Sequence, residues 1–172
     1  MSIYALGELL PRIDPRAFVH PDAIVIGDVS IGPDASIWPS AVLRGDYGPI
    51  QVHEGSSVQD GTVVHAGPEY PTVIGPWAVV GHNAHLEGCT VAPWALVASQ
   101  STVLHYCVVH SHATVGAGAV VTNRMQVPSF AMALGVPARI HPDRVTEFEH
   151  RFSVNSYIEL AARTRDELRL VG

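Results

Sequence analysis

Aliphatic residues that recur at every sixth position constrain the fold of this chain more than any other feature. The series runs from Val19 to Val121 with two longer steps, and a small residue commonly stands four positions after each aliphatic residue. An α-helix repeats its apolar positions about every 3.6 residues and a half-buried strand every second residue, so neither pattern accounts for the series. The members are Val19, Val25, Ile31, Ile37, Leu43, Val52, Val58, Val64, Ile74, Val80, Leu86, Val91, Val97, Val103, Val109, Val115 and Val121.

A six-residue period is the sequence signature of a parallel β-helix. Each hexad supplies a short strand and a turn, three hexads close one triangular coil, and the aliphatic side chain points inward. A β-sandwich is disfavoured because its strands return about every 8–12 residues. The steps from Leu43 to Val52 and from Val64 to Ile74 are longer than six residues, and both predict protruding loops.

The pattern changes after Pro142 to charged and apolar residues typical of a helix. We therefore expect a β-helix domain over residues 1–141 and a C-terminal helical segment over 142–172 that packs on it. Val145, Phe148 and Phe152 are expected to share one helix face. Ser156 with Glu159 three positions later resembles a capping box and predicts a break near 153–156, followed by a second helical piece.

Composition excludes several classes of function. The chain has 172 residues, a formal net charge of −6 and no basic run, which argues against nucleic-acid binding. The first residues carry only short apolar pieces, so we expect neither a signal peptide nor a membrane span, and a cytoplasmic location. The two cysteines, Cys89 and Cys107, occupy equivalent turn positions; we expect reduced thiols, although the spacing would permit a disulfide.

Counting hexads places polar side chains on particular faces. The residue after an inward aliphatic residue points outward, since side chains alternate along a strand. One face is therefore expected to present Arg44, His65, Glu87 and Leu104 on successive coils, about 4.8 Å apart. A different edge is expected to present a second column, formed by Asp60, His82 and Ser99.

These two columns lie on separate edges of one prism, so His65 and Glu87 cannot easily meet His82 within a single chain. Two chains could bring them together if the face of one packs against the edge of the next. Threefold closure would repeat that contact and bury the sites between subunits. The pattern thus predicts a homotrimer.

The polar residues resemble those of the gamma-class carbonic anhydrase family, within the hexapeptide-repeat proteins. The resemblance is carried by VLRGD, VQDGTVVH, VGHNAHLEGC and GVPA, and it extends over nearly the whole chain. It implies an all-β, left-handed parallel β-helix with a C-terminal α-helix. It also implies a trimer whose interfaces hold a zinc-type ion, and reversible hydration of CO2 to bicarbonate by a metal-bound hydroxide.

The resemblance implies roles for individual residues. His65 and His82 match two metal ligands. Arg44 and Asp46 match a pair that meets across the interface and orients site residues, and here a structural ion pair is favoured over an acid–base pair. The remaining matched positions are Gln59, which would contact the hydroxide, Asp60, an interface acid, and Tyr157 in the final helix.

Glu87 occupies the position of the third histidine ligand in that family. His₂Glu is an accepted zinc set and also suits Fe or Co, but an anionic ligand should acidify bound water less than a third histidine. His85 is an alternative ligand, because it points outward on the same strand as Glu87. A third interpretation has no metal, with His65 and His82 hydrogen-bonded to Asp46 or Asp60.

Three function classes follow. The first is a metal-dependent lyase of carbonic anhydrase type, the second a catalytically silent trimeric scaffold or binding protein, and the third a hexapeptide acyltransferase. His105, His110 and His112 fall at different positions of successive hexads and are expected to be solvent-exposed turn residues. Trp38, Trp77 and Trp94 are expected to cover interfaces near turns.

Overall fold

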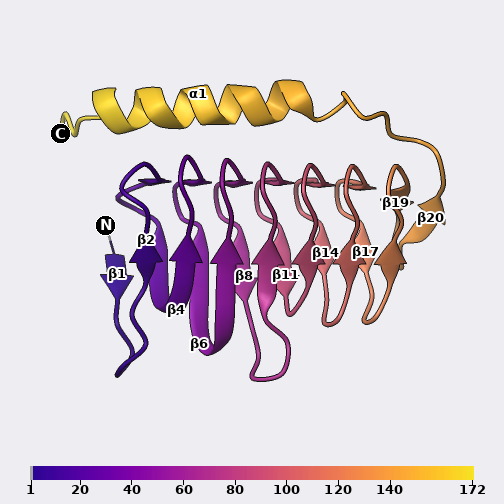
Figure 1. The fold of residues 1–172 in the computed structure, drawn as a ribbon, viewed down its shortest axis with the longest axis horizontal. Coiled ribbons are helices and arrows are strands. Elements are labelled where there is room, and N and C mark those ends of the chain that lie inside the picture. Colours follow the sequence, from indigo (N-terminus) through magenta and orange to yellow (C-terminus); the bar gives the residue numbers. More distant parts are fainter. Residues whose placement is uncertain (1) are drawn as a thin grey trace.

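The computed structural model describes residues 2–172 as a left-handed parallel β-helix with one α-helix lying along it (Figure 1). The coils advance along the prism, and the chain then returns beside them through the helix, so both termini lie at the same end. The fold class expected from the six-residue repeat is confirmed.

The first face of the prism is formed by strands that pair in parallel with the coil before and the coil after. Two of its strands, β4 and β6, continue around a corner onto the second face, with a register shift between Gly27 and Val29. The strands of this face are β1 (Ser2–Tyr4), β4 (Ile24–Ile31), β6 (Val42–Val52), β8 (Val63–His65), β11 (His85–Glu87), β14 (Thr102–Val103) and β17 (Val120–Val121).

The second and third faces are built in the same way. Among the strands of residues 2–172, only the last pair, β19 with β20, is antiparallel. The second face holds β2 (Arg12–Ile13), the later halves of β4 and β6, β9 (Thr72–Ile74), β12 (Thr90–Val91), β15 (Val108–Val109) and β18 (Gln126–Val127). The third holds β3 (Phe18–Val19), β5 (Ser36–Ile37), β7 (Ser57–Val58), β10 (Val79–Val80), β13 (Leu96–Val97), β16 (Thr114–Val115), β19 (Met132–Leu134) and β20 (Arg139–His141).

The core is a stack of the repeated aliphatic side chains, and its register matches the hexad count. Leu43 pairs with Val64, Val64 with Leu86, and Leu86 with Val103, and all four are fully buried. Buried alanines fill the corners between the faces. The inward column therefore fixes which side chains point outward beside it.

The two long steps in the repeat have different structures. Residues 66–71 form the expected loop, closed by a bridge between Gly67 and Tyr70. The protruding loop expected between Leu43 and Val52 is wrong, because these residues are one continuous strand, β6, which pairs with β4, β8 and β9. Pairing with β4, which also runs through the corner, keeps the ladder of backbone hydrogen bonds on both sides of a register shift between Gly27 and Val29.

The expected break in the C-terminal helix is also wrong. A single helix, α1 (Arg151–Glu167), runs through Ser156, while residues 142–150 form turns and irregular backbone. No glycine or proline interrupts this segment, so an interior serine does not end the helix. The expected shared face fails as well, since Val145 is buried whereas the side chain of Phe152 is 82% exposed.

Helix α1 packs on the third face, beside β3, β5 and β7. Ala161 and Tyr157 meet Phe18 and Trp38, and the Trp38 and Tyr157 rings lie 5.9 Å apart between centroids. At the start of the helix, the buried His150 bonds through Nδ1 to the Trp94 carbonyl at 2.8 Å and through Nε2 to Thr114 at 2.9 Å. The division into units 1–141 and 142–172 stays a prediction.

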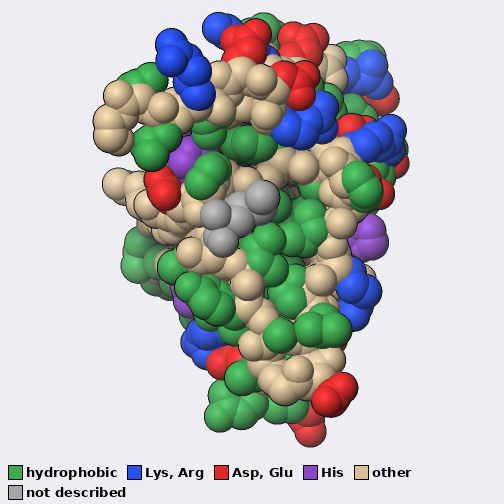
Figure 2. Space-filling view, turned by 90° about the vertical axis from the view of Figure 1, so that its left-hand side faces the viewer, with side chains coloured by type: hydrophobic (Ala, Val, Ile, Leu, Met, Phe, Trp, Pro, Cys, Tyr) green, Lys and Arg blue, Asp and Glu red, His purple; other side chains and the backbone are tan. Residues whose placement is uncertain are grey.

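The end of the prism at which both termini lie carries many hydrophobic side chains (Figure 2). A cleft of about 520 Å³ opens there between α1 and the first coils, with Ile13, Phe18 and Leu168 in its lining. None of the residues expected to form the functional site lines this cleft. Across residues 2–172, no helix has the length and apolar character needed to cross a membrane.

Replacing Ile74 by alanine should lower the free energy of unfolding by about 2–5 kcal/mol, because its side chain is fully buried in the stack. Val73→Ala, one residue earlier on β9 and partly exposed, is the matched control and should cost clearly less. Urea denaturation measures both. Equal losses would contradict the assignment of Ile74 to the inward column.

Ser156→Ala should leave the free energy of unfolding unchanged or raise it by up to about 0.5 kcal/mol, since alanine is the better residue inside a helix. A capping serine would instead cost about 1 kcal/mol when removed. Urea denaturation distinguishes the two cases. A loss of about 1 kcal/mol in the free energy of unfolding would instead support the predicted helix break near Ser156.

Candidate functional site

The outward column of the first face forms as the repeat predicts. Arg44 pairs in register with His65, and His65 with Glu87. His65 Nδ1 lies 3.0 Å from Glu87 Oε1, a hydrogen bond between adjacent coils. The hexad count therefore identified side chains that touch in the folded chain.

Asp46 joins this column through the spacing of the Arg-Gly-Asp triplet. Positions 44 and 46 lie on the same side of β6, while Gly45 is buried between them. A Cβ at Gly45 would lie 2.5 Å from the Asp28 carbonyl oxygen on the neighbouring strand, so only glycine fits. This close approach brings Arg44 and Asp46 to one surface.

His65 lies between two carboxylates. Its Nε2 is 2.9 Å from Asp46 Oδ1, while its Nδ1 bonds Glu87, and Arg44 donates to Asp46 within the same chain. Burial acts to raise the pKa of Asp46, but hydrogen bonds from Arg44 and His65 outweigh it and hold the pKa below its usual range. Both ring nitrogens of His65 are thus engaged.

Glu87 is the centre of a group of imidazoles. His85 Nε2 lies 3.4 Å from its Oε2, and His105 Nε2 lies 3.4 Å from its Oε1. Burial acts to raise the pKa of Glu87. The hydrogen bond from His65 and the nearby rings of His105 and His85 lower the pKa by more than burial raises it, so it lies below its usual range.

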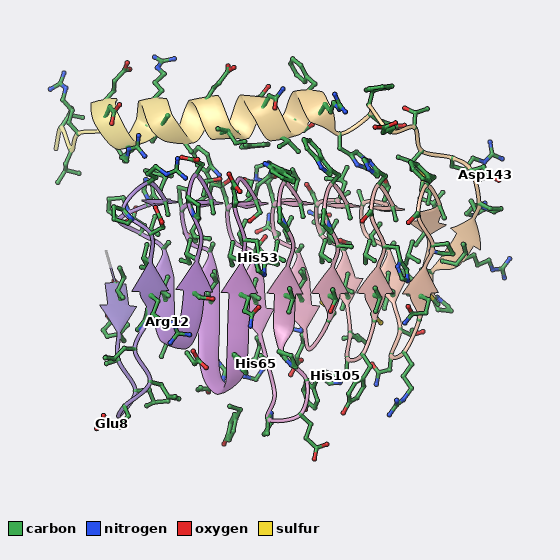
Figure 3. The ribbon with its side chains drawn as sticks, viewed as in Figure 1. Glu8, Arg12, His53, His65, His105 and Asp143 are labelled. Atoms are coloured by element: carbon green, nitrogen blue, oxygen red, sulfur yellow. The ribbon has the colours of Figure 1, made fainter. Side chains whose placement is uncertain are left out.

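Sequence reasoning missed His105, which was expected to be a solvent-exposed turn residue. Its ring is 4.6 Å from that of Tyr70, between centroids, and its Nε2 is shielded from solvent. His65 and His105 lie along the same edge of the prism, near the loop over residues 66–71 (Figure 3). One signal was available, because His105 directly follows Leu104, the residue that the hexad count places one coil after Glu87.

The second column also forms, with different exposure. His82 Nδ1 bonds Asp60 Oδ2 at 2.8 Å, and the His82 side chain is 46% exposed. Gln59, the preceding residue on this coil, is buried. Burial and the nearby Asp60 carboxylate raise the pKa of Tyr157, which places the helix tyrosine in the electrostatic field of this column.

The donors of the two columns do not converge in one chain. Within residues 2–172, no group of three histidine, cysteine, aspartate or glutamate side chains is placed to bind a metal ion. The hydrogen bonds of the metal-free interpretation, from His65 to Asp46 and from His82 to Asp60, are both present.

The donor set nevertheless fits a divalent metal ion in its chemistry. A metal-ligating histidine usually has one ring nitrogen bonded to a carboxylate. Asp60 bonds Nδ1 of His82 in this way, and Nε2 of His82 has no protein partner in the described chain. His105 Nε2 is buried without a hydrogen-bond partner beside Glu87. His65 would have to release one carboxylate to bind a metal.

Other histidines and cysteines lie apart from this site. His110 pairs with Gln126, and His112, also expected to be exposed, stacks between Trp94 and Phe130 with its Nδ1 buried. Both thiols, at Cys89 and Cys107, are free and buried, and burial raises their pKa values.

Comparison with known proteins finds no matching family model, but it finds close relatives. The chain is 40% identical to gamma carbonic anhydrase 1, mitochondrial, of Arabidopsis thaliana, over 88% of its own length and 58% of the plant protein. It is 36% identical to the carnitine operon protein CaiE of Salmonella agona, over 98% of its length and 86% of CaiE. The chain thus spans little more than half of its plant relative.

A solved structure agrees with these relatives. The hexapeptide transferase family protein of Anaplasma phagocytophilum is 37% identical to this chain and superposes on it with a TM-score of 0.88. The match covers 97% of this chain and 98% of the Anaplasma protein. Sequence relatives and fold point to the same group. The chain belongs to the gamma-carbonic-anhydrase-like family of hexapeptide-repeat, left-handed β-helix proteins.

Proposed function

We propose that this chain is a metalloprotein of carbonic anhydrase type whose metal sites lie between the subunits of a homotrimer. The observation that carries the proposal is the division of the donors between two edges of one prism. His65 and Glu87 touch on one edge, while His82 is held on another by Asp60, and its side chain is 46% exposed. A second copy is what could complete this arrangement.

The proposed ligands are His65, His82 and Glu87, with His85 as the alternative to Glu87. Zinc is the first candidate, and Fe or Co suits the same set. A bound ion of this kind lowers the pKa of water, so that hydroxide can attack CO2 near neutral pH. Because Glu87 is anionic, we expect weaker acidification of water than with three neutral histidines.

The remaining site residues act on these donors. Asp60 orients the His82 ring, and Asp46, itself held by Arg44, holds Nε2 of His65. For His65 to bind a metal through Nε2, Asp46 would have to turn toward Arg44 alone. We assign Gln59 to orient the reacting oxygen and Tyr157 to the wall of the site beside Asp60.

Two other functions have specific support. A catalytically silent scaffold is supported by the hydrogen bonds of His65, which satisfy both ring nitrogens without a metal. An acyltransferase is supported by the name of the Anaplasma relative, a hexapeptide transferase family protein. Binding of acetyl-CoA in a calorimeter would favour the acyltransferase. A cytoplasmic location remains a prediction.

The purified protein loaded with zinc should retain about one metal ion per chain and hydrate CO2 faster than buffer in stopped flow. Loss of a group that only supports a metal ligand typically lowers metal affinity about 10–100-fold. His82→Ala removes a ligand itself, so its metal affinity should fall by at least this factor. His110→Ala removes an imidazole that pairs with Gln126 away from the site and should match the parent.

A different result would support the scaffold instead. If the parent holds no stoichiometric metal, and His65→Ala leaves its assembly in analytical ultracentrifugation unchanged, the metal proposal fails.

Asp60→Asn should weaken zinc binding about tenfold and lower the pKa of Tyr157, because it removes the negative charge beside both groups. A raised phenol pKa stabilises the folded protein below the usual value of 10.0, and this contribution is lost as the pH rises through the raised value. Ultraviolet titration of the parent against Tyr157→Phe measures the pKa. An unchanged pKa of Tyr157 in Asp60→Asn would contradict the electrostatic interaction between Asp60 and Tyr157.

A further inference from the structure

Glu87 is surrounded by three imidazoles that come from three consecutive coils. His65 lies on the coil before, His85 on its own strand, and His105 on the coil after. Oε1 faces both His65, at 3.0 Å, and His105, at 3.4 Å, while Oε2 faces only His85. One carboxylate oxygen is therefore held between two coils.

The three imidazoles differ in exposure. The side chain of His85 is 39% exposed, that of His105 28% and that of His65 15%. Oε1 thus faces the two more buried rings, whereas Oε2 faces the most exposed one. The two oxygens of the carboxylate therefore face imidazoles of different exposure.

The ring of His105 is supported by the loop over residues 66–71. Tyr70 from this loop contacts His105 and, at 5.3 Å between centroids, Tyr106, whose ring also carries the guanidinium of Arg124 at 4.5 Å. A side chain at Gly88 would collide with Tyr70, at 2.3 Å. Tyr70 therefore packs closely beside Glu87 and limits the movement of His105.

The Nε2 of His105 lacks a completed hydrogen bond. It is shielded from solvent, and its contact with Glu87, at 3.4 Å, is outside good hydrogen-bond geometry. A buried polar atom without a partner is costly, so a neighbouring acceptor that moves toward it is favoured. The nearest carboxylate available for such a movement is Glu87.

We propose that His105 is a positioning residue that holds Oε1 of Glu87, so that Oε2 is the oxygen available to a metal ion. This inference rests on the proposed function for the part that concerns metal. His105 acts through the carboxylate, because its Nε2 is shielded from solvent and faces Oε1 of Glu87.

The test is a double-mutant cycle on cobalt binding. Co²⁺ affinity and its visible absorption spectrum are measured for the parent, His105→Ala, Glu87→Ala and the double variant, with His105→Gln as the conservative variant and His110→Ala as the control. His105→Ala should weaken Co²⁺ binding about 10-fold or more and alter the spectrum, while His105→Gln keeps a side-chain donor and recovers part of the affinity. The double variant should bind no more weakly than Glu87→Ala alone, because the two residues act in series.

A second measurement does not depend on metal. Long-range ¹H–¹⁵N spectra of the metal-free protein report the ring nitrogens of His65, which bonds the same oxygen of Glu87. His105→Ala should shift these resonances in the direction that Glu87→Gln does, and His110→Ala should not.

The outcomes separate the two proposals. Absence of Co²⁺ binding by the parent defeats the proposed function, and the His65 resonances then decide the positioning role alone. Parent-like affinity or a parent-like spectrum in His105→Ala, additive losses in the double variant, or unshifted His65 resonances would each overturn the role of His105. Equal unfolding midpoints in urea exclude misfolding as the cause of a loss.

Discussion

The in-register stacking of coils about 4.8 Å apart is the constraint on which the rest of this structure depends. Because Leu43, Val64 and Leu86 stack inward, the residues that follow them stack outward at the same spacing. Hydrogen bonds between side chains on neighbouring coils then form without any loop having to bring them together. The contact between His65 and Glu87 is a direct consequence of the core.

The site that results places an arginine, two carboxylates and a histidine along one edge. Arg44, Asp46, His65 and Glu87 form a continuous series of polar contacts, and His82 stands on another edge with its own carboxylate. Glu87 keeps an oxygen donor where the family resemblance expects a histidine. The exchange also introduces a negative charge, which the surrounding imidazoles stabilise.

The sequence predicted the fold and both columns, because a strict repeat determines register and side-chain direction together. It failed where the answer depends on packing. The long step between Leu43 and Val52 predicts a protruding loop, but its residues extend β6 against β4. Ser156 resembles a helix cap but lies within α1. The position of His105 depends on Tyr70, whose loop has no repeat from which its direction could be counted.

An anomalous diffraction map of the zinc-loaded protein, collected at the zinc edge, would locate the metal relative to the subunits. We expect one strong peak at each contact between copies of the chain, between His65 and Glu87 of one copy and His82 of the next. Absence of a peak, or a peak whose ligands all come from a single chain, would contradict this expectation.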